Sequence, residues 1–273
     1  MSSITDTLEK SEIKNVDAAV LSYIVPRLLP LVNKIALFEA VVFFMIAFFG
    51  TFSPVWIGFL MVLPVIGGIS SYILVMREAQ HIFMKQIAKD LNFTYSEVED
   101  VTAFTQIFST SNIYEIDDML VGTYDGLPTR IFNCMLKMSQ GDIHANVNTV
   151  FEIELDSHVP TIAILGRNNH QTIFKNLQNL REIQMEGDFS KNFNVWIEND
   201  TQLEAYEILT PDVMKEIEDL SNPINILFIS NKLYIFTSRL ITSKSEFITT
   251  DHLISRFLTE WLPIIKDSNV MEK

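Results

Sequence analysis

Charge is nearly absent from residues 35–76, a stretch of 42 residues in which Glu39 is the one charged side chain. Residues 50–54, Gly-Thr-Phe-Ser-Pro, divide this stretch into apolar runs of 15 and 22 residues. A helix rises about 1.5 Å per residue, so about 20 apolar residues cross the hydrocarbon core of a bilayer. The lack of charge therefore excludes an ordinary soluble segment and predicts a transmembrane helical hairpin at residues 31–76.

Cysteine occurs once, as Cys134, so the chain cannot form an internal disulfide. A lone cysteine fits a reducing compartment. An early apolar run is also lacking, because residues 2–17 are mostly polar, and this argues against a secretory signal peptide. Both features fit a protein whose soluble part is not secreted.

The motifs of common catalytic and cofactor sites are missing as well. The sequence contains no GxGxxG or GxxxxGK[ST] loop, no GxSxG turn and no HExxH helix. None of the histidines is spaced from another as zinc ligands are; they are His81, His144, His158, His170 and His252. We therefore predict no catalytic residue, no zinc site and no cofactor from sequence motifs.

Acidic residues predominate only after the predicted hairpin. From Asp90 onward the chain has 28 acidic and 13 basic residues, a net charge of −15, whereas the residues before it have a net charge of +1. This acidity argues against nucleic acid as a partner, because phosphates are repelled. Basic residues flank the hairpin and are absent from its turn; they are Arg27, Lys34, Arg77, Lys85 and Lys89. Because positive residues stay on the cytoplasmic side, we predict that both termini and the soluble domain are cytoplasmic.

Amphipathic helical patterns lie on both sides of the hairpin. In the N-terminal segment, residues 1–30, apolar residues recur at helical spacing between 11 and 29; they are Ile13, Val16, Val20, Tyr23 and Ile24. Two placements of this helix remain open, on the headgroup layer or on the soluble domain. After the hairpin the helical pattern continues, which predicts a helical stalk at residues 77–92.

Residues 93–273 show the pattern of an antiparallel α+β domain. Alternating apolar and polar residues predict strands at 119–124, 129–136, 147–155, 161–165, 193–197, 204–209, 224–229 and 233–237. Hairpin turns are predicted at 125–126 and 230–232. Helices are predicted at 174–183, at 210–222 with Thr210 as N-cap, and from 251 onward. We therefore expect an α+β protein, in which an N-terminal transmembrane helical hairpin is followed by an antiparallel-sheet cytoplasmic domain with inserted helices.

Three carboxylates recur along the predicted strand at 147–155 and just beyond its end: Glu152, Glu154 and Asp156. Such a row can supply oxygen ligands to a hard cation such as Ca²⁺ or Mg²⁺. A solvated strand face has the same sequence, so both interpretations remain. These three residues are the candidate metal site. Cys134 lies in a predicted strand among apolar residues, which favours a small buried side chain over a reactive thiol.

Residues 189–196, Phe-Ser-Lys-Asn-Phe-Asn-Val-Trp, and residues 204–214, Glu-Ala-Tyr-Glu-Ile-Leu-Thr-Pro-Asp-Val-Met, are the most distinctive part of the chain. They resemble a bacterial membrane family with two transmembrane helices, classed as domain of unknown function thirty-one thirty-seven. The Gly-Thr-Tyr-Asp-Gly run at 122–126 and the predicted hairpin also match, so the resemblance spans residues 28–237. The family has no assigned activity, so the resemblance implies a membrane location and no catalytic residue.

The sequence favours a membrane-anchored cytoplasmic binding or scaffolding protein of the bacterial inner membrane over an enzyme. Its expected partners are the lipid bilayer and either another protein or a second copy of itself. Two alternatives remain: a membrane-tethered enzyme that uses Glu152, Glu154 and Asp156 with a divalent cation, and a pleckstrin-like lipid or peptide binder, which rests on fold analogy. A deep polar pocket would favour the enzyme, whereas an exposed apolar patch or an open sheet edge would favour the binder.

Overall fold

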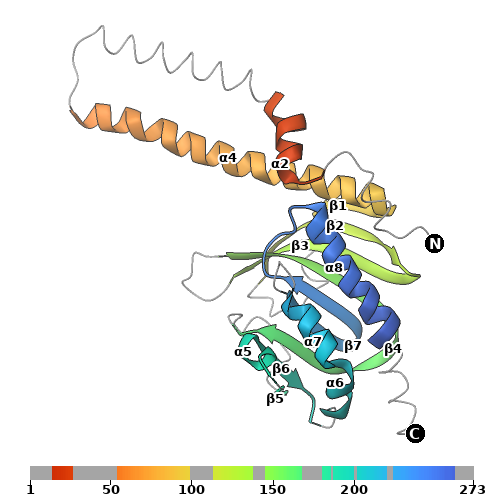
Figure 1. Cartoon of the computed structure of the whole chain (residues 1–273). Coiled ribbons are helices and arrows are strands. Elements are labelled where there is room, and N and C mark those ends of the chain that lie inside the picture. Colours follow the sequence, from red (N-terminus) through yellow and green to blue (C-terminus); the bar gives the residue numbers. More distant parts are fainter. Residues whose placement is uncertain are drawn as a thin grey trace. The chain divides into compact units, whose positions relative to one another are not determined.

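The computed structural model describes residues 14–26, 54–98, 113–137, 145–167, 180–185, 187–199, 202–219 and 224–261. Two compact units are present: the first is Ser11–Gln86, and the second contains Ile87–Lys273. Figure 1 labels the helices and strands of both units.

Two short helical elements begin the first unit, α2 at Val16–Ala19 and η1 at Val20–Ile24. Asn15 caps the first turn, because its Oδ1 accepts a hydrogen bond from the Ala18 amide at 2.7 Å. The buried side of these helices consists of Val16, Ala19 and Ile24. The helix predicted at residues 11–29 is therefore confirmed over its described part.

Helix α4 extends over Pro54–Leu91 and joins the second predicted span to the predicted stalk without a break. Asn92 follows with a φ of 57°, the left-handed conformation that often ends a helix. The Phe93 amide donates to the Ala88 carbonyl at 2.8 Å. The Asn92 amide donates to the Lys89 carbonyl at 3.2 Å. These two bonds satisfy carbonyl groups of the last turn, and the predicted end of the stalk is confirmed.

Much of the predicted hairpin lies outside the described residues, because the description omits residues 27–53 and the side chains of residues 54–71. Over the residues that are described, no helix combines the length and the apolar character needed to cross a membrane. The hairpin thus remains a prediction from the sequence.

In the described part of the second unit, seven strands form one antiparallel sheet, as the α+β prediction requires. The order along the sheet is β1-β2-β3-β4-β6-β5, and β7 pairs with the other edge of β4. The strands are β1 Thr94–Val98, β2 Ile113–Tyr124, β3 Leu127–Lys137, β4 Ala145–Gly166, β5 Arg181–Ile183, β6 Phe193–Ile197 and β7 Ile224–Thr237. At the β2–β3 turn, Asp125 and Gly126 have φ values of 48° and 86°, as the predicted type I′ turn needs.

Helices cover one face of this sheet, and Figure 1 shows α7 and α8 lying over it on the same side. The helical elements are α5 Phe189–Asn192, α6 Gln202–Ile208, α7 Pro211–Glu218, α8 Lys244–Arg256 and η5 Phe257–Trp261. The rings of Phe151 in β4 and Phe247 in α8 pack with centroids 5.4 Å apart. The opposite face has a core of its own, which includes Phe132, Val150, Tyr234 and Phe236. The central strands are therefore buried on both faces.

Strands β4 and β7 are longer than predicted. β4 continues through Pro160, which the sequence predicts to end a strand, and β7 continues through residues 230–232, which the sequence predicts to be a hairpin turn. β4 and β7 pair with each other before and after these residues. The register between the two strands shifts between Glu154 and Ile162. Ser230 has a φ of 58° there. The turn-forming residues thus produce a bulge in a long ladder, and the predicted second hairpin is wrong.

Two other assignments from the sequence are wrong. Residues 204–208 belong to helix α6 instead of a strand, because Ala205, Ile208 and Leu209 form a buried face at helical spacing. Residues 181–183 form β5 instead of the end of a helix. Short apolar runs fit both periods, which explains both errors. Most of the helix predicted at 174–183 lies outside the described residues.

Candidate functional site

The structure separates the three acidic residues of the candidate metal site. Glu152 is 4% exposed, whereas Glu154 and Asp156 are exposed to solvent. The register between β4 and β7 shifts after Glu154, so Asp156 does not continue the same regular ladder. In the described part of the chain, no group of three His, Cys, Asp or Glu side chains is arranged to hold a metal ion. The interpretation of all three as a solvated strand face is wrong for Glu152.

Glu152 forms ion pairs with one residue from each neighbouring strand. Arg130 of β3, its direct cross-strand partner, donates from Nη2 to Glu152 Oε1 at 2.5 Å. Lys232 of β7 donates from Nζ to the same oxygen at 2.7 Å. The Arg130 and Lys232 side chains are 30% and 24% exposed. Two cations thus pair with the one buried carboxylate of the candidate metal site.

A chain of buried and partly buried hydrogen bonds crosses the sheet from β1 to the segment before α8. Tyr95 Oη donates to Asp118 Oδ1 at 2.6 Å, and Asn133 Nδ2 donates to Asp118 Oδ2 at 2.9 Å. Thr149 Oγ1 then donates to Asn133 Oδ1 at 2.9 Å and accepts from the Ile241 amide at 3.0 Å. Burial and the Asp118 carboxylate raise the pKa of Tyr95, which keeps its hydroxyl as a donor. The chain therefore ties four strands and the start of α8 together.

Sequence analysis missed this hydrogen-bonded chain. The one sequence signal of it is the Asp117-Asp118 pair, which lies inside β2. Asp118 has a φ of 54°, at a point where the register between β2 and β3 shifts. Partners in other strands hold this unusual conformation, and the register that brings them together is not visible in a single sequence.

Another buried carboxylate, Asp251, lies on α8. Asp251 is 5% exposed and lies beside Tyr124, whose hydroxyl donates to the Asp251 backbone carbonyl at 3.2 Å. Both residues line a small, mainly apolar cavity together with Phe151 and Phe247. Burial raises the pKa of Asp251 to about 6, against smaller opposing effects of Tyr124 and His252.

Neither Cys134 nor the surface hollow near β5 resembles a nucleophilic site. Cys134 is fully buried, and burial raises the pKa of its thiol to about 12, which confirms the interpretation as an inert core residue. The hollow has a volume of about 410 Å³ and lies open between β5, β6 and α5. In it Arg167 Nε donates to Asn194 Oδ1 at 3.4 Å, and Ser190 Oγ donates to the Met185 carbonyl at 2.5 Å. The hydroxyl of its serine therefore donates to a backbone carbonyl.

The end of α4 is fixed within the second unit by an ion pair and by close packing. Lys244 Nζ of α8 lies 3.3 Å from Asp90 Oδ2, and the two side chains are 7% and 9% exposed. The Phe93 ring, just after the helix, lies against Gly122 of β2 so closely that a Cβ atom at Gly122 would be 2.3 Å from Phe93 Cδ1. The last turn of α4 is therefore a built-in part of the sheet domain.

Comparisons with known proteins give two likenesses. A comparison with curated proteins finds no match. Among solved structures, the crystal structure of the mycobacterial trehalose monomycolate transport factor A, TtfA, is similar with a TM-score of 0.49 and 9% sequence identity, covering 65% of this chain and 92% of that chain. The second likeness is to a family model described as "Protein of unknown function (DUF3137)", which matches residues 138–259. This part of the chain, which contains β4 to α8, is thus similar to a family of unknown function.

Proposed function

We propose that this chain is a binding or scaffolding protein anchored in the bacterial inner membrane. A helical hairpin at residues 31–76 anchors it, and the sheet domain at residues 93–273 faces the cytoplasm. The domain contacts a protein partner or a second copy of the chain at the membrane surface.

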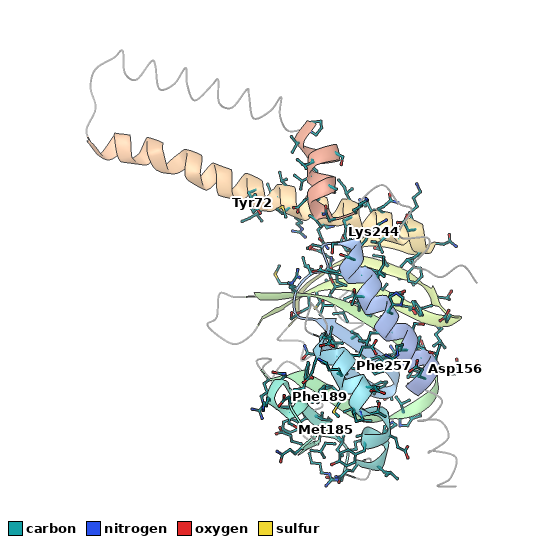
Figure 2. All side chains as sticks on the ribbon, viewed as in Figure 1. Tyr72, Asp156, Met185, Phe189, Lys244 and Phe257 are labelled. Carbon is teal, nitrogen blue, oxygen red and sulfur yellow. The ribbon has the colours of Figure 1, made fainter. Side chains whose placement is uncertain are left out.

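The observation that carries the anchor is the exposed apolar surface of α4. Tyr72, Ile73 and Leu74 are 65%, 59% and 67% exposed, and Figure 2 labels Tyr72 on this helix. Successive helical residues point about 100° apart, so three in a row occupy more than half of the circumference. A helix in water keeps large apolar side chains on one buried side, whereas a helix in lipid exposes them all round. Arg77 follows Leu74 three residues later, as basic residues do at the cytoplasmic end of a span.

The sequence around these residues supports the same interpretation. Residues 55–76 contain no charged side chain and are long enough to cross a bilayer as a helix. They belong to α4, which continues to Leu91. The last turn of this helix belongs to the sheet domain, so the helix would connect the proposed anchor directly to that domain.

The binding role is supported by the ends of the sheet and by an exposed apolar pair. Strands β1 and β5 stand at the two ends of the order of the described strands, and end strands are the place where a sheet can pair with another chain. On α6, Leu203 and Tyr206 lie one turn apart and are 69% and 42% exposed. Exposed large apolar side chains of this kind are typical of contact surfaces.

Labelling with a membrane-impermeant thiol reagent tests the anchor and its orientation. In a Cys134→Ser background, single variants Ser53→Cys and Ser268→Cys are expressed as the full chain in cells whose outer envelope admits the reagent. We expect the reagent to label the variant at Ser53 in intact cells, and the variant at Ser268 only after lysis. Labelling at Ser268 from outside would overturn the cytoplasmic orientation, and extraction of the chain by alkaline carbonate would overturn the anchor.

Photocrosslinking tests the contact surface on α6. The full chain carrying Leu203→Cys in the Cys134→Ser background is modified with a thiol-linked photocrosslinker and irradiated in native membranes. We expect a discrete adduct, whereas Lys191→Cys on the exposed side of α5 serves as a matched control and forms none. Equal behaviour of the two sites would count against a contact surface at Leu203.

A further inference from the structure

The helical segment of residues 14–26 exposes apolar side chains that the first unit does not bury. Leu21 is 71% exposed and Val25 is 39% exposed, and the two lie one turn apart. The other side of the same segment is buried through Val16, Ala19 and Ile24. A helix that packs on protein and otherwise faces water needs only one apolar side. The exposed apolar side of this helix therefore indicates a contact with another apolar surface.

The chain keeps this segment close to the proposed anchor. Eight residues separate Pro26 from Ile35, the start of the first apolar run. An extended chain spans at most 3.3–3.6 Å per residue, so this connection reaches about 30 Å. The segment therefore cannot lie farther than that from the point where the proposed hairpin enters the bilayer, and the lipid surface is within reach of Leu21 and Val25.

The charges around the segment suit a lipid surface. Lys14 is exposed and lies at one end of the exposed side. Arg27 and Lys34 follow the helix in sequence. Asp17 is the one acidic residue between Lys14 and Lys34. Basic residues beside exposed apolar ones are the composition of interfacial helices, in which the apolar side enters the acyl boundary and the cations contact anionic headgroups. The flanking Asp17 and Ser22 are exposed and stand at the borders of the apolar stripe.

From these observations we infer that the segment lies in the headgroup layer of the bilayer, with Leu21 and Val25 inserted at the acyl boundary. This inference rests on the proposed membrane anchor. It decides between the two placements that the sequence leaves open, and it makes the N-terminal segment a second membrane contact that restricts the tilt of the first unit.

Depth-dependent quenching of a fluorescent label tests this placement. The full chain with Leu21→Cys in the Cys134→Ser background carries an environment-sensitive NBD label and is reconstituted in vesicles of equal parts phosphatidylcholine and phosphatidylglycerol. Ser245→Cys, on the exposed start of α8, is the water-exposed control. We expect a blue-shifted emission at Leu21 that shallow doxyl-labelled lipid quenches, whereas iodide quenches the label at Ser245.

The outcomes separate the inference from the proposed function. Iodide quenching at Leu21 equal to that at Ser245 would overturn the inference while the protein stays in carbonate-washed vesicles. A blue-shifted label at Leu21 that neither doxyl lipid nor iodide quenches would also overturn it, because Leu21 would then be packed on protein. Loss of the whole chain from the vesicles after the carbonate wash would instead overturn the anchor. Leu21→Asp with Val25→Asp should abolish the lipid quenching of a label placed at Ala18→Cys, whereas Ser22→Asp should leave it unchanged.

Discussion

Lys244 of α8 and Asp90 of α4 form an ion pair that is almost completely buried, with Nζ and Oδ2 3.3 Å apart. The pair joins the last turn of α4 to the helix that covers the sheet. Removing one member of a buried pair leaves the other charge without compensation, which costs far more than the pair itself contributes. This relationship makes the junction between α4 and the sheet domain sensitive to a single substitution.

Replacing Lys244 with Met should destabilise the sheet domain by about 3 kcal/mol, because the Asp90 carboxylate remains buried and loses its ion pair with Lys244. Urea unfolding of the full chain in detergent, followed by tryptophan fluorescence, measures this cost. Lys215→Met is the matched control, since its pair with Asp219 has side chains that are 67% and 63% exposed, and it should have little effect. The double variant Lys244→Met, Asp90→Asn should recover part of the lost stability. Equal losses in the single variants Lys244→Met and Lys215→Met would contradict the prediction.

Gly122 should not tolerate even one added methyl group. In Gly122→Ala the new Cβ would meet the Phe93 ring at 2.3 Å, so the ring or the strand must move, at a cost of about 1–3 kcal/mol. Phe93→Leu alone should also destabilise, but in the double variant the two costs should partly cancel, because the smaller side chain leaves room. Additive losses in a double-mutant cycle of unfolding free energies would show that the two residues do not press on each other.

Helices α7 and α8 should respond differently to substitution of the residues at their N-cap positions. Ser243 Oγ accepts a hydrogen bond from the Glu246 amide at 3.3 Å, so Ser243→Ala should cost about 1 kcal/mol. Thr210 precedes α7 with extended backbone, but its side chain makes no capping hydrogen bond, so Thr210→Ala should change stability little. Unfolding midpoints of the two variants give the comparison. A larger loss at Thr210 than at Ser243 would contradict this assignment.

How far the sequence determines the fold is clearest at these same elements. Pro211 after Thr210 marks the start of α7, and Asp125-Gly126 marks the β2–β3 turn, because φ restrictions act locally and are visible in two or three residues. The apolar pattern predicts the start of the last helix at 251, whereas α8 begins at Lys244. The Ser243-Lys-Ser-Glu246 sequence was the available signal, since a Ser three residues before Glu is typical of a helix start.

The polar contacts of the domain depend on strand register, which local patterns do not provide. Alternation predicted a strand around Glu152, but its ion pairs need Arg130 from β3 and Lys232 from β7 on the same side of β4. A strand buried on both faces also hides a carboxylate that simple alternation assigns to solvent. The chain from Tyr95 to Thr149 needs the same cross-strand information, and this is why the sequence predicted the sheet and missed its polar contacts.

The acidic residues of β4 should bind no divalent cation tightly. Glu152 is neutralised by Arg130 and Lys232, and Glu154 accepts a hydrogen bond from Asn231 at 3.3 Å, which leaves too few oxygens for a cation that takes about six. Calorimetric titration of the full chain with Ca²⁺ or Mg²⁺ should show no site of micromolar affinity. Stoichiometric binding that disappears in Glu154→Gln, but not in the control Glu198→Gln, would make the metal-dependent enzyme the leading hypothesis.

Asp251 should give the domain a stability that falls as pH rises. Burial raises the pKa of Asp251 to about 6 in the folded protein, from 3.8 in the ordinary case, so the folded state holds its proton where the unfolded state has lost it. The contribution of the neutral carboxyl to the free energy of unfolding is complete below about pH 4 and is lost by about pH 6. The free energy of unfolding therefore falls by about 3 kcal/mol over this range. Asp251→Asn cannot ionise and should therefore match the wild type near pH 4 and exceed its stability near pH 7.

Unfolding free energies of both chains across this range check the sign of the effect. Asp188→Asn is the control, because Asp188 is exposed and its hydrogen bond to Lys191 lowers its pKa, the opposite direction. The difference between Asp251→Asn and the wild type should grow with pH, since only the wild type must bury a charge beside Tyr124 and the apolar rings of Phe151 and Phe247. A difference that is constant with pH would mean that Asp251 ionises equally easily in the folded and unfolded chains, and that the cavity beneath α8 admits water.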